Sequence, residues 1–178
     1  MRAMRSITIL PVLALVACLG QDEAEEADGE ALIEAVASGE TAMERIQLQV
    51  GEFTFDATAA GPVDGELVFM LHGFPQSSYE FRNQIPAVAE MGFRVVAPDQ
   101  RGYGRTTGWS REYDDDLAPF RFLNLMRDVY CLVDALGYES VAAVVGHDFG
   151  SPVAADCALI RPDAVSYTHL TLPTKRIV

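Results

Sequence analysis

Residues 141–150 read VAAVVGHDFG. The first five residues are a continuous apolar run, which predicts a strand covered on both faces of a sheet. The segment from Gly150 to Ile160 has helical character. Gly146 and Gly150 bracket the central residues, and glycines are needed where a strand turns sharply into a helix, because the turn strains the backbone and excludes side chains. The pattern therefore predicts that Asp148 lies at the tip of a tight turn, in the arrangement called a nucleophile elbow.

Further strands and helices are expected on the N-terminal side of this turn. Continuous apolar runs predict buried strands at Leu67–Leu71 and Arg94–Ala97, and period-two alternation predicts a hairpin of half-buried strands at Arg45–Val50 and Phe53–Thr58. Helices are expected over Ala31–Ser38, Tyr79–Glu90 and Leu123–Leu136. Buried strands that alternate with helices predict an α/β fold, with a mostly parallel sheet and helices on both faces.

A carboxylate at the centre of the turn restricts the chemistry. If a serine attacked a saturated carbon, the product would be an ether, which water does not readily cleave. A carboxylate that attacks the same carbon leaves an ester, which activated water can hydrolyse. Asp148 therefore indicates substrates that are opened at an sp3 carbon, such as epoxides or alkyl halides.

A second motif, His72-Gly73-Phe74-Pro75, directly follows the predicted strand at Leu67–Leu71. In folds with a nucleophile elbow, the loop after this strand supplies one main-chain N–H of the oxyanion hole, and the residue after the nucleophile supplies the other. We assign these donors to Phe74 and Phe149. They would stabilise the tetrahedral intermediate of ester hydrolysis, and one such donor typically contributes about 3–4 kcal/mol.

Three runs together, HGFPQSSYEFRNQIP, PDQRGYG and VVGHDFG, resemble the epoxide hydrolase branch of the α/β-hydrolases over about Glu44–Asp163. The resemblance implies an α/β-hydrolase fold in which Asp148 attacks an epoxide carbon and water then releases a diol. It implies a small hydrophobic substrate, no cofactor and no metal. The residues that support the nucleophile and the oxyanion hole would be His72, Gly73, Pro75, Gly146, His147 and Gly150.

Other residues of the matching segments are interpreted as structural. We expect His72 to orient the oxyanion loop and His147 to pack beneath the elbow. The segment after the second buried strand is expected to be loop structure; it contains Asp99, Arg101, Gly102, Tyr103 and Gly104. Asp114-Asp115-Asp116 is expected to be a solvated acidic turn and not a metal site.

Relatives with an aspartate nucleophile remain alternatives. Haloalkane dehalogenases usually carry tryptophan after the nucleophile and asparagine at the position of Phe74, and fluoroacetate dehalogenases carry arginine after the nucleophile. Phe149 departs from all of these patterns, and also from the tryptophan common in epoxide hydrolases, so substrate choice stays open. A haloalkane dehalogenase-type hydrolase and a non-catalytic module built on the same fold are therefore kept as alternatives.

The C-terminal segment does not continue the resemblance. In this fold the catalytic acid and a late histidine follow the nucleophile, and epoxide hydrolases also insert a helical cap with two tyrosines. His169 is the only histidine after Asp148 and lies too early. Residues 165–178 look like the translation of a sequencing adapter. We expect a fold truncated before the cap and the C-terminal strands, with a hydrolase core over residues 44–164, a non-native tail over 165–178, and no catalytic turnover.

The N-terminal segment is typical of export. The apolar segment Ser6–Ala17 is too short to span a bilayer, which takes roughly 20 residues. The sequence LVAC at residues 15–18 resembles the lipobox of bacterial lipoproteins, which implies a signal peptide over residues 1–17 and lipidation of Cys18. Residues 18–43 would form an acidic tether to a membrane of the bacterial cell envelope, on the periplasmic or outer-membrane side. An ordinary signal peptide with an incidental cysteine is the alternative.

Composition excludes some classes of partner. A formal net charge of −13 argues against nucleic acid, because a phosphate backbone requires a basic surface. A hydrophobic content of 49% is sufficient for a packed core. Cys131 and Cys157 fall within apolar helical patterns, so we expect them to be buried free thiols. The oligomeric state is left open.

Overall fold

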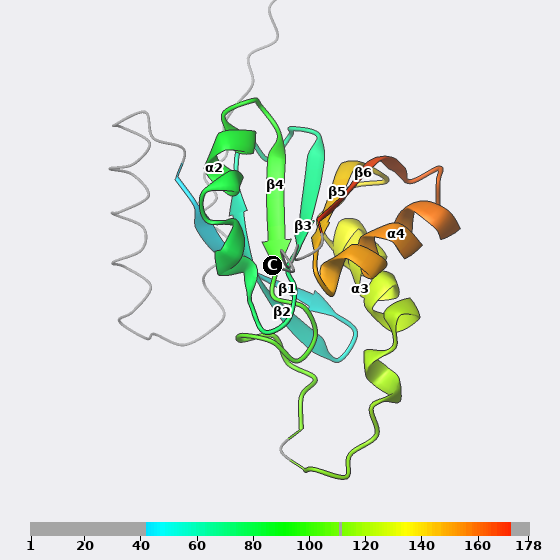
Figure 1. Ribbon diagram of the computed structural model, residues 1–178. Helices are drawn as coiled ribbons and strands as arrows, with labels where there is room; N and C mark the ends of the chain where they lie inside the picture. The colour runs from blue at the N-terminus through cyan, green and yellow to red at the C-terminus, as the bar shows by residue number, and fades with distance from the viewer. Residues whose placement is uncertain (1–41, 111, 172–178) are drawn as a thin grey trace, which may run out of the picture.

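The computed structural model describes residues 42–110 and 112–171 (Figure 1). These residues form a six-stranded sheet with the strand order β1-β2-β4-β3-β5-β6. The strands, in chain order, are β1 Glu44–Val50, β2 Phe53–Ala60, β3 Leu67–Leu71, β4 Arg94–Pro98, β5 Val141–His147 and β6 Val165–Thr171. The helical elements are the 3-10 turns η2 Ser78–Phe81 and η3 Ala118–Phe120, and the α-helices α2 Gln84–Ala89, α3 Phe122–Ala135 and α4 Gly150–Ile160.

The sheet is parallel at its centre and antiparallel at one side. β4, β3, β5 and β6 run parallel to one another, whereas β1 and β2 form an antiparallel hairpin that joins β4 through β2. Every residue of β3 and β4 is buried, while burial alternates with exposure along β1. The expected α/β architecture is confirmed, because buried parallel strands require helices on both of their faces.

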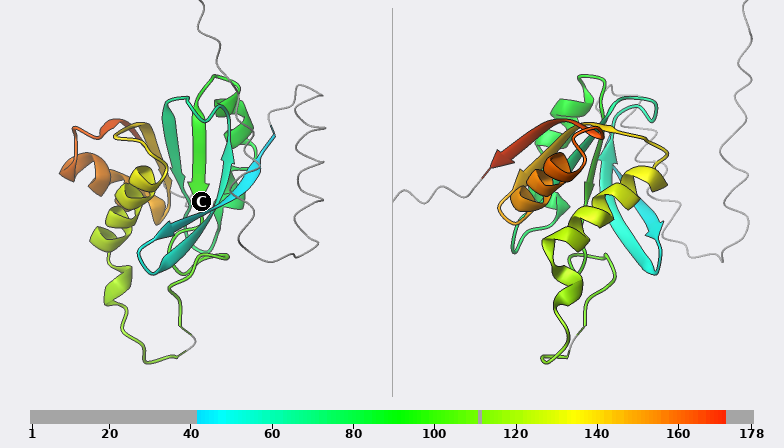
Figure 2. Two further views of the ribbon diagram at one scale, coloured as in Figure 1. Left: turned by 180° about the vertical axis from the view of Figure 1, so that it is seen from behind. Right: turned by 90° about the vertical axis from the view of Figure 1, so that its right-hand side faces the viewer.

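Two apolar clusters show how the helices cover the sheet. Leu67, Phe69 and Leu71 of β3 belong to a cluster that also contains buried residues of α3 and α4. Val68 and Met70 belong to a second cluster, with α2 and the last residue of η2. Alternate residues of one strand therefore face opposite layers, and Figure 2 shows α2 on one side of the sheet and α3 with α4 on the other.

The helix expected over Tyr79–Glu90 was wrong as a continuous element. The structure instead forms the turn η2, which the Ser77 side chain caps at the Tyr79 N–H, followed by the short helix α2. Pro86 explains the interruption, because proline has no N–H to donate to an earlier turn and is tolerated only near a helix start. The other predicted strands, and the helices at 123–136 and 150–160, agree with the structure to within a few residues.

Residues 165–171, which we expected to lie outside the hydrolase core, form the strand β6. It pairs with β5 from Val141↔Val165 to His147↔Thr171. Val165 is buried against the main core cluster, whereas Tyr167 and Leu170 are exposed. Strand pairing uses main-chain groups that any residue other than proline supplies, so β5 can pair with this segment. The non-native origin of residues 165–178 stays a prediction.

The N-terminal predictions lie outside the described residues. This holds for the signal peptide, Cys18, the helix at Ala31–Ser38 and nearly all of the acidic tether. Among the helices of residues 42–110 and 112–171, none is long and apolar enough to cross a membrane.

Cys131 is half-buried, Cys157 is buried, and both are free thiols. Burial raises the pKa of Cys157 to about 12, so this thiol is unreactive at neutral pH.

We predict that Phe69→Ala destabilises the fold by about 3–5 kcal/mol, because it opens a cavity at the centre of the sheet. Phe69 is fully buried in β3. Urea unfolding followed by circular dichroism measures the change, and Val63→Ala, at a position that is 77% exposed, is the control. If the two variants unfold at the same urea concentration, the assignment of Phe69 to the core is wrong.

Candidate active site

The elbow lies where β5 turns into α4. Asp148 follows the last residue of β5 and has a φ of 47°, which places a non-glycine residue in the left-handed region. The Ser151 N–H donates to the Asp148 carbonyl at 2.9 Å, and the Ser151 hydroxyl donates to the Gly146 carbonyl at 2.9 Å. A residue held in this region carries strain of about 1–3 kcal/mol and persists only where its surroundings fix it.

Two glycines let the elbow approach the end of β3. A Cβ atom on Gly150 would lie 2.0 Å from the main-chain oxygen of Leu71, and a Cβ atom on Gly73 would lie 2.4 Å from the Cβ of Asp148. Neither approach is possible for a residue with a side chain. The motifs at 72–75 and 146–150, which are far apart in sequence, therefore meet at the carboxyl ends of β3 and β5.

Main-chain amides hold the Asp148 carboxylate. The Phe74 N–H donates to Oδ2 at 2.9 Å, and the Phe149 N–H also bonds the carboxylate. The Phe74 amide, and after it the Phe149 amide, have the largest effects and lower the pKa of Asp148. Burial opposes them with a smaller effect, and the nearby His147 lowers this pKa least. The carboxylate is therefore an anion at neutral pH, as a nucleophile must be. The structure brings together the three residues predicted for nucleophile and oxyanion hole, while their catalytic roles stay a prediction.

The surface beside the carboxylate is aromatic. The Phe74 and Phe149 side chains are 62% and 52% exposed, and their ring centroids are 6.3 Å apart. Phe122, at the start of α3, adds a third ring 6.1 Å from that of Phe149. Exposed aromatic rings around one charged group are suited to an apolar molecule with a single reactive centre.

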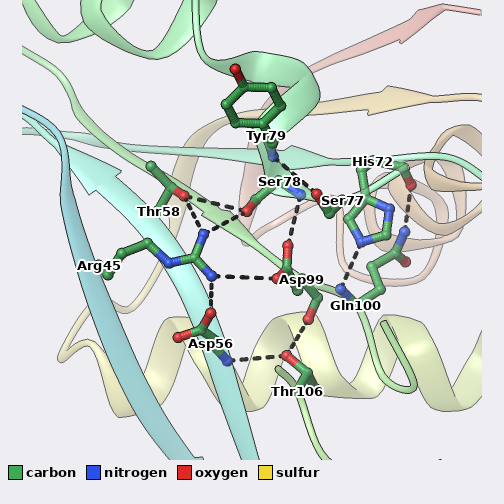
Figure 3. Close-up of polar contacts among 10 residues, drawn as sticks. All are labelled: Arg45, Asp56, Thr58, His72, Ser77, Ser78, Tyr79, Asp99, Gln100 and Thr106. Atoms are coloured by element: carbon green, nitrogen blue, oxygen red, sulfur yellow. Dashed lines mark hydrogen bonds and ion pairs between the residues drawn. The ribbon is translucent and has the colours of Figure 1, made fainter. Parts of the chain in front are cut away.

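His72 locks the oxyanion loop in one conformation. It is fully buried, and its Nε2 accepts the Gln100 N–H at 2.9 Å, so the proton of the neutral ring lies on Nδ1 and is donated to the Gly73 carbonyl at 2.9 Å. The Gln100 side chain in turn donates to the His72 carbonyl (Figure 3). Burial lowers the pKa of His72, so the ring stays neutral and connects the residues before and after it by hydrogen bonds; its role in orienting an oxyanion hole stays a prediction.

Arg45 joins a buried carboxylate of β2 to one that directly follows β4 (Figure 3). Its guanidinium pairs with Asp56 of β2, and its Nη2 lies 3.4 Å from Oδ2 of Asp99, which follows β4. The other oxygen of Asp99 accepts the Ser78 N–H at 2.7 Å. The Thr106 hydroxyl connects the same two acidic residues through their main chains. This network anchors η2, and with it the end of the loop that carries Phe74.

The segment after β4 is loop structure, as expected. Arg101 is buried and forms a two-pronged pair with Asp128 of α3, at 2.9 Å from Nε and 2.5 Å from Nη2. Its guanidinium also stacks on the Phe53 ring. Tyr103 packs edge-on against His72. These contacts tie the loop to β2, to α3 and to the oxyanion loop.

The remaining predicted residues lie at the surface or beneath the elbow. Asp114, Asp115 and Asp116 are exposed in a turn, and the structure shows no metal-binding cluster among the residues that it describes. His169 is exposed on β6. His147 is half-buried and interacts electrostatically with the Glu80 carboxyl group.

Sequence reasoning missed Arg45, Gln100 and Glu80. Glu80 is half-buried in η2, and burial is the largest of the effects that raise the pKa of its carboxyl group. Each of these three residues acts on a partner that is distant in sequence. Only for Arg45 did the sequence hold an indication, because the alternation along β1 places it among the polar positions of that strand.

The sequence profile of the alpha/beta hydrolase fold matches residues 66–173. The chain therefore belongs to the alpha/beta hydrolase family. Epoxide hydrolase B of Mycobacterium tuberculosis (strain ATCC 25618 / H37Rv) is 48% identical over 109 residues, which cover 60% of this chain and 29% of that protein. An epoxide hydrolase of Caballeronia sordidicola is 42% identical over 99 residues, covering 56% of this chain and 28% of the relative.

Solved structures of epoxide hydrolases also resemble this chain. The crystal structure of epoxide hydrolase A from Mycobacterium thermoresistibile superposes with a TM-score of 0.66 at 32% identity, covering 72% of this chain and 39% of that chain. The chain thus spans less than half the length of the relatives that it matches. The residues that match the family profile include both motifs of the site.

We predict that Arg45→Met destabilises the protein by about 2–3 kcal/mol, because Asp56 and Asp99 would be left buried without their cation. Loss of one partner from a buried pair typically costs about 3–5 kcal/mol, and we expect less here because Arg45 itself is 43% exposed. Thermal unfolding measures the change. Arg82→Met is the matched control, since that guanidinium stacks on the exposed Tyr79 ring. Equal melting temperatures for the two variants would contradict a structural role for the Arg45 network.

Proposed function

We propose that the hydrolase to which these residues belong opens epoxides to diols through an ester at Asp148. The observation that carries the proposal is the anionic Asp148 carboxylate, held at the elbow by the N–H groups of Phe74 and Phe149. The similarity to epoxide hydrolases supports the choice of substrate. The aromatic rings beside the carboxylate favour a small hydrophobic epoxide.

The proposed reaction has two stages. A carboxylate oxygen of Asp148 bonds to an epoxide carbon, the carbon–oxygen bond of the ring breaks, and the freed oxygen takes a proton to become a hydroxyl. Water then attacks the ester carbonyl, and the oxyanion that forms accepts hydrogen bonds from the Phe74 and Phe149 amides. Collapse of this intermediate releases the diol and restores the carboxylate. The reaction uses no cofactor.

The second stage needs an activated water, and we assign that role to no described residue. We propose that the 178-residue chain forms the ester and stalls.

Hydrolytic removal of halide from an alkyl halide is the second candidate function, because an alkyl halide would form the same kind of ester at Asp148. Phe74 favours the epoxide, since haloalkane dehalogenases usually carry asparagine at that position. Phe149 does not separate the two substrates, because tryptophan is common there in both families.

Trapping the ester tests the proposal on the chain itself. Incubation with an aryl epoxide should add the full mass of the epoxide, because ring opening loses no atoms, and peptide mapping should place the addition on Asp148. Asp148→Asn keeps the shape of the side chain but has no carboxylate oxygen to attack with, so it should remain unmodified. Absence of any addition to Asp148 in the unaltered chain would overturn the nucleophile. Faster modification by alkyl halides than by epoxides would reverse the ranking of substrates.

We also propose that the protein is exported and held to the bacterial cell envelope by lipid on Cys18, on the basis of the LVAC sequence at residues 15–18. In a bacterial host, the protein should fractionate with membranes and incorporate labelled fatty acid. Cys18→Ser should lose both properties, while Cys131→Ser should retain them. Membrane association of Cys18→Ser equal to that of the unaltered protein would favour the alternative of an ordinary signal peptide.

A further inference from the structure

Phe122 is an aromatic residue near the nucleophile that takes no part in the reaction described above. It is the first residue of α3, and its side chain is 39% exposed. Neither of the two apolar clusters that form the core of the described residues contains it. Contiguous exposed apolar side chains are typical of surfaces that bind another molecule. Packing in the core therefore does not explain this ring, and contact with a ligand would.

A series of ring contacts connects Phe122 to the residues that hold the nucleophile. The amides of Phe74 and Phe149 bond the Asp148 carboxylate, and the rings of the same two residues lie 6.3 Å apart, edge to face. The Phe122 ring lies 6.1 Å from that of Phe149. The contacts thus run from Phe74 through Phe149 to Phe122, and α3 adds a ring to the two that the oxyanion loop and the elbow supply.

The start of α3 is held by contacts that do not involve the Phe122 ring. The Asn124 side chain donates to the Ala118 carbonyl at 2.9 Å. The Phe120 ring packs against Gly102 so closely that a Cβ atom on the glycine would lie 2.9 Å from it. These contacts fix the main chain on both sides of Phe122. The ring is therefore placed beside Phe149 before any ligand arrives, and its removal should leave the start of the helix in position.

We propose that Phe122 is a specificity-determining residue, which favours epoxides that carry a phenyl-sized apolar substituent. The inference rests on the proposed function, because it concerns the molecule that Asp148 attacks. A methyl substituent lies directly beside the reacting carbon and reaches only the rings nearest the carboxylate. A benzyl substituent places its ring several bonds further from that carbon, where it packs against Phe122.

The contribution of Phe122 belongs to binding and not to the chemical step. Aromatic pairs are stabilised by burial of area and by edge-to-face geometry, and a phenyl ring on the substrate gains both from Phe122. The Phe122 side chain has no group that donates or accepts a proton, so it acts equally on the bound epoxide and on the transition state. Such an interaction changes the concentration needed for saturation and leaves the limiting rate unchanged.

Ester formation by the full 178-residue chain tests the inference with two epoxides that differ by one phenyl group. Propylene oxide and benzyloxirane present the same kind of aliphatic carbon to Asp148, so their comparison isolates the substituent. Intact-mass spectrometry at several epoxide concentrations separates the limiting rate from the half-saturation concentration. For Phe122→Ala we expect the half-saturation concentration of benzyloxirane to rise about three- to tenfold, with its limiting rate and the reaction of propylene oxide unchanged.

Three further variants show whether the aromatic ring itself is responsible. Phe122→Tyr keeps the ring and should retain the preference for benzyloxirane, whereas Phe122→Leu keeps an apolar side chain without a ring and should lose part of that preference. Leu159→Ala is the matched control, because it removes an apolar side chain that is 79% exposed on α4, and it should behave like the unaltered chain. Circular dichroism establishes that each variant is folded.

The results that contradict the inference differ from the result that contradicts the function. If Phe122→Ala slows both epoxides by the same factor, the ring only supports Phe149, and if it slows neither, the ring does not contact the substrate. Either result overturns the inference while the function stands. If the unaltered chain forms no ester at Asp148 with either epoxide, the proposed function fails and the inference fails with it.

Discussion

The close approach of the elbow to the end of β3 is the constraint on which the site depends. β3 and β5 are parallel neighbours paired from Val68↔Ala143 to Leu71↔Gly146, so their carboxyl ends meet at one edge of the sheet. The chain leaves β3 towards the layer of α2, and it leaves β5 into α4 on the opposite layer. Binding sites of open α/β sheets occur where neighbouring strands diverge in this way. Gly150 then allows contact close enough for the Phe74 amide to reach Asp148.

The sequence was sufficient for the parts of the molecule that depend on local pattern. Continuous apolar runs identified β3, β4 and β5, since a strand buried on both faces leaves no alternative to apolar residues. The glycines of the elbow identified the strained turn, and the order of the motifs identified which amides would face the carboxylate. These predictions succeeded because each needs only a short segment together with a general rule of strand packing.

Other features follow from contacts that no short segment contains. The helix expected at Tyr79–Glu90 is interrupted at Arg82-Asn83, because Pro86 has no N–H to donate to the preceding turn and this outweighs the apolar spacing. Arg45 meets Asp99 across 54 positions, and the Gln100 N–H meets the His72 ring across 28 positions. Strand β6 shows a related limit, because main-chain pairing with β5 does not require the apolar side chains by which buried strands are recognised. Long-range electrostatics and edge pairing are therefore visible only in three dimensions.

At position 148 the residue that best suits the positive φ is not the residue that the proposed reaction requires. Glycine adopts that conformation without a steric penalty, and asparagine tolerates it better than most residues do. A collection of position-148 variants ranked by yield of soluble protein would therefore place inert forms beside or above the natural aspartate. Engineering that selects for stability alone would therefore remove the proposed nucleophile early, unless every round of selection also required activity.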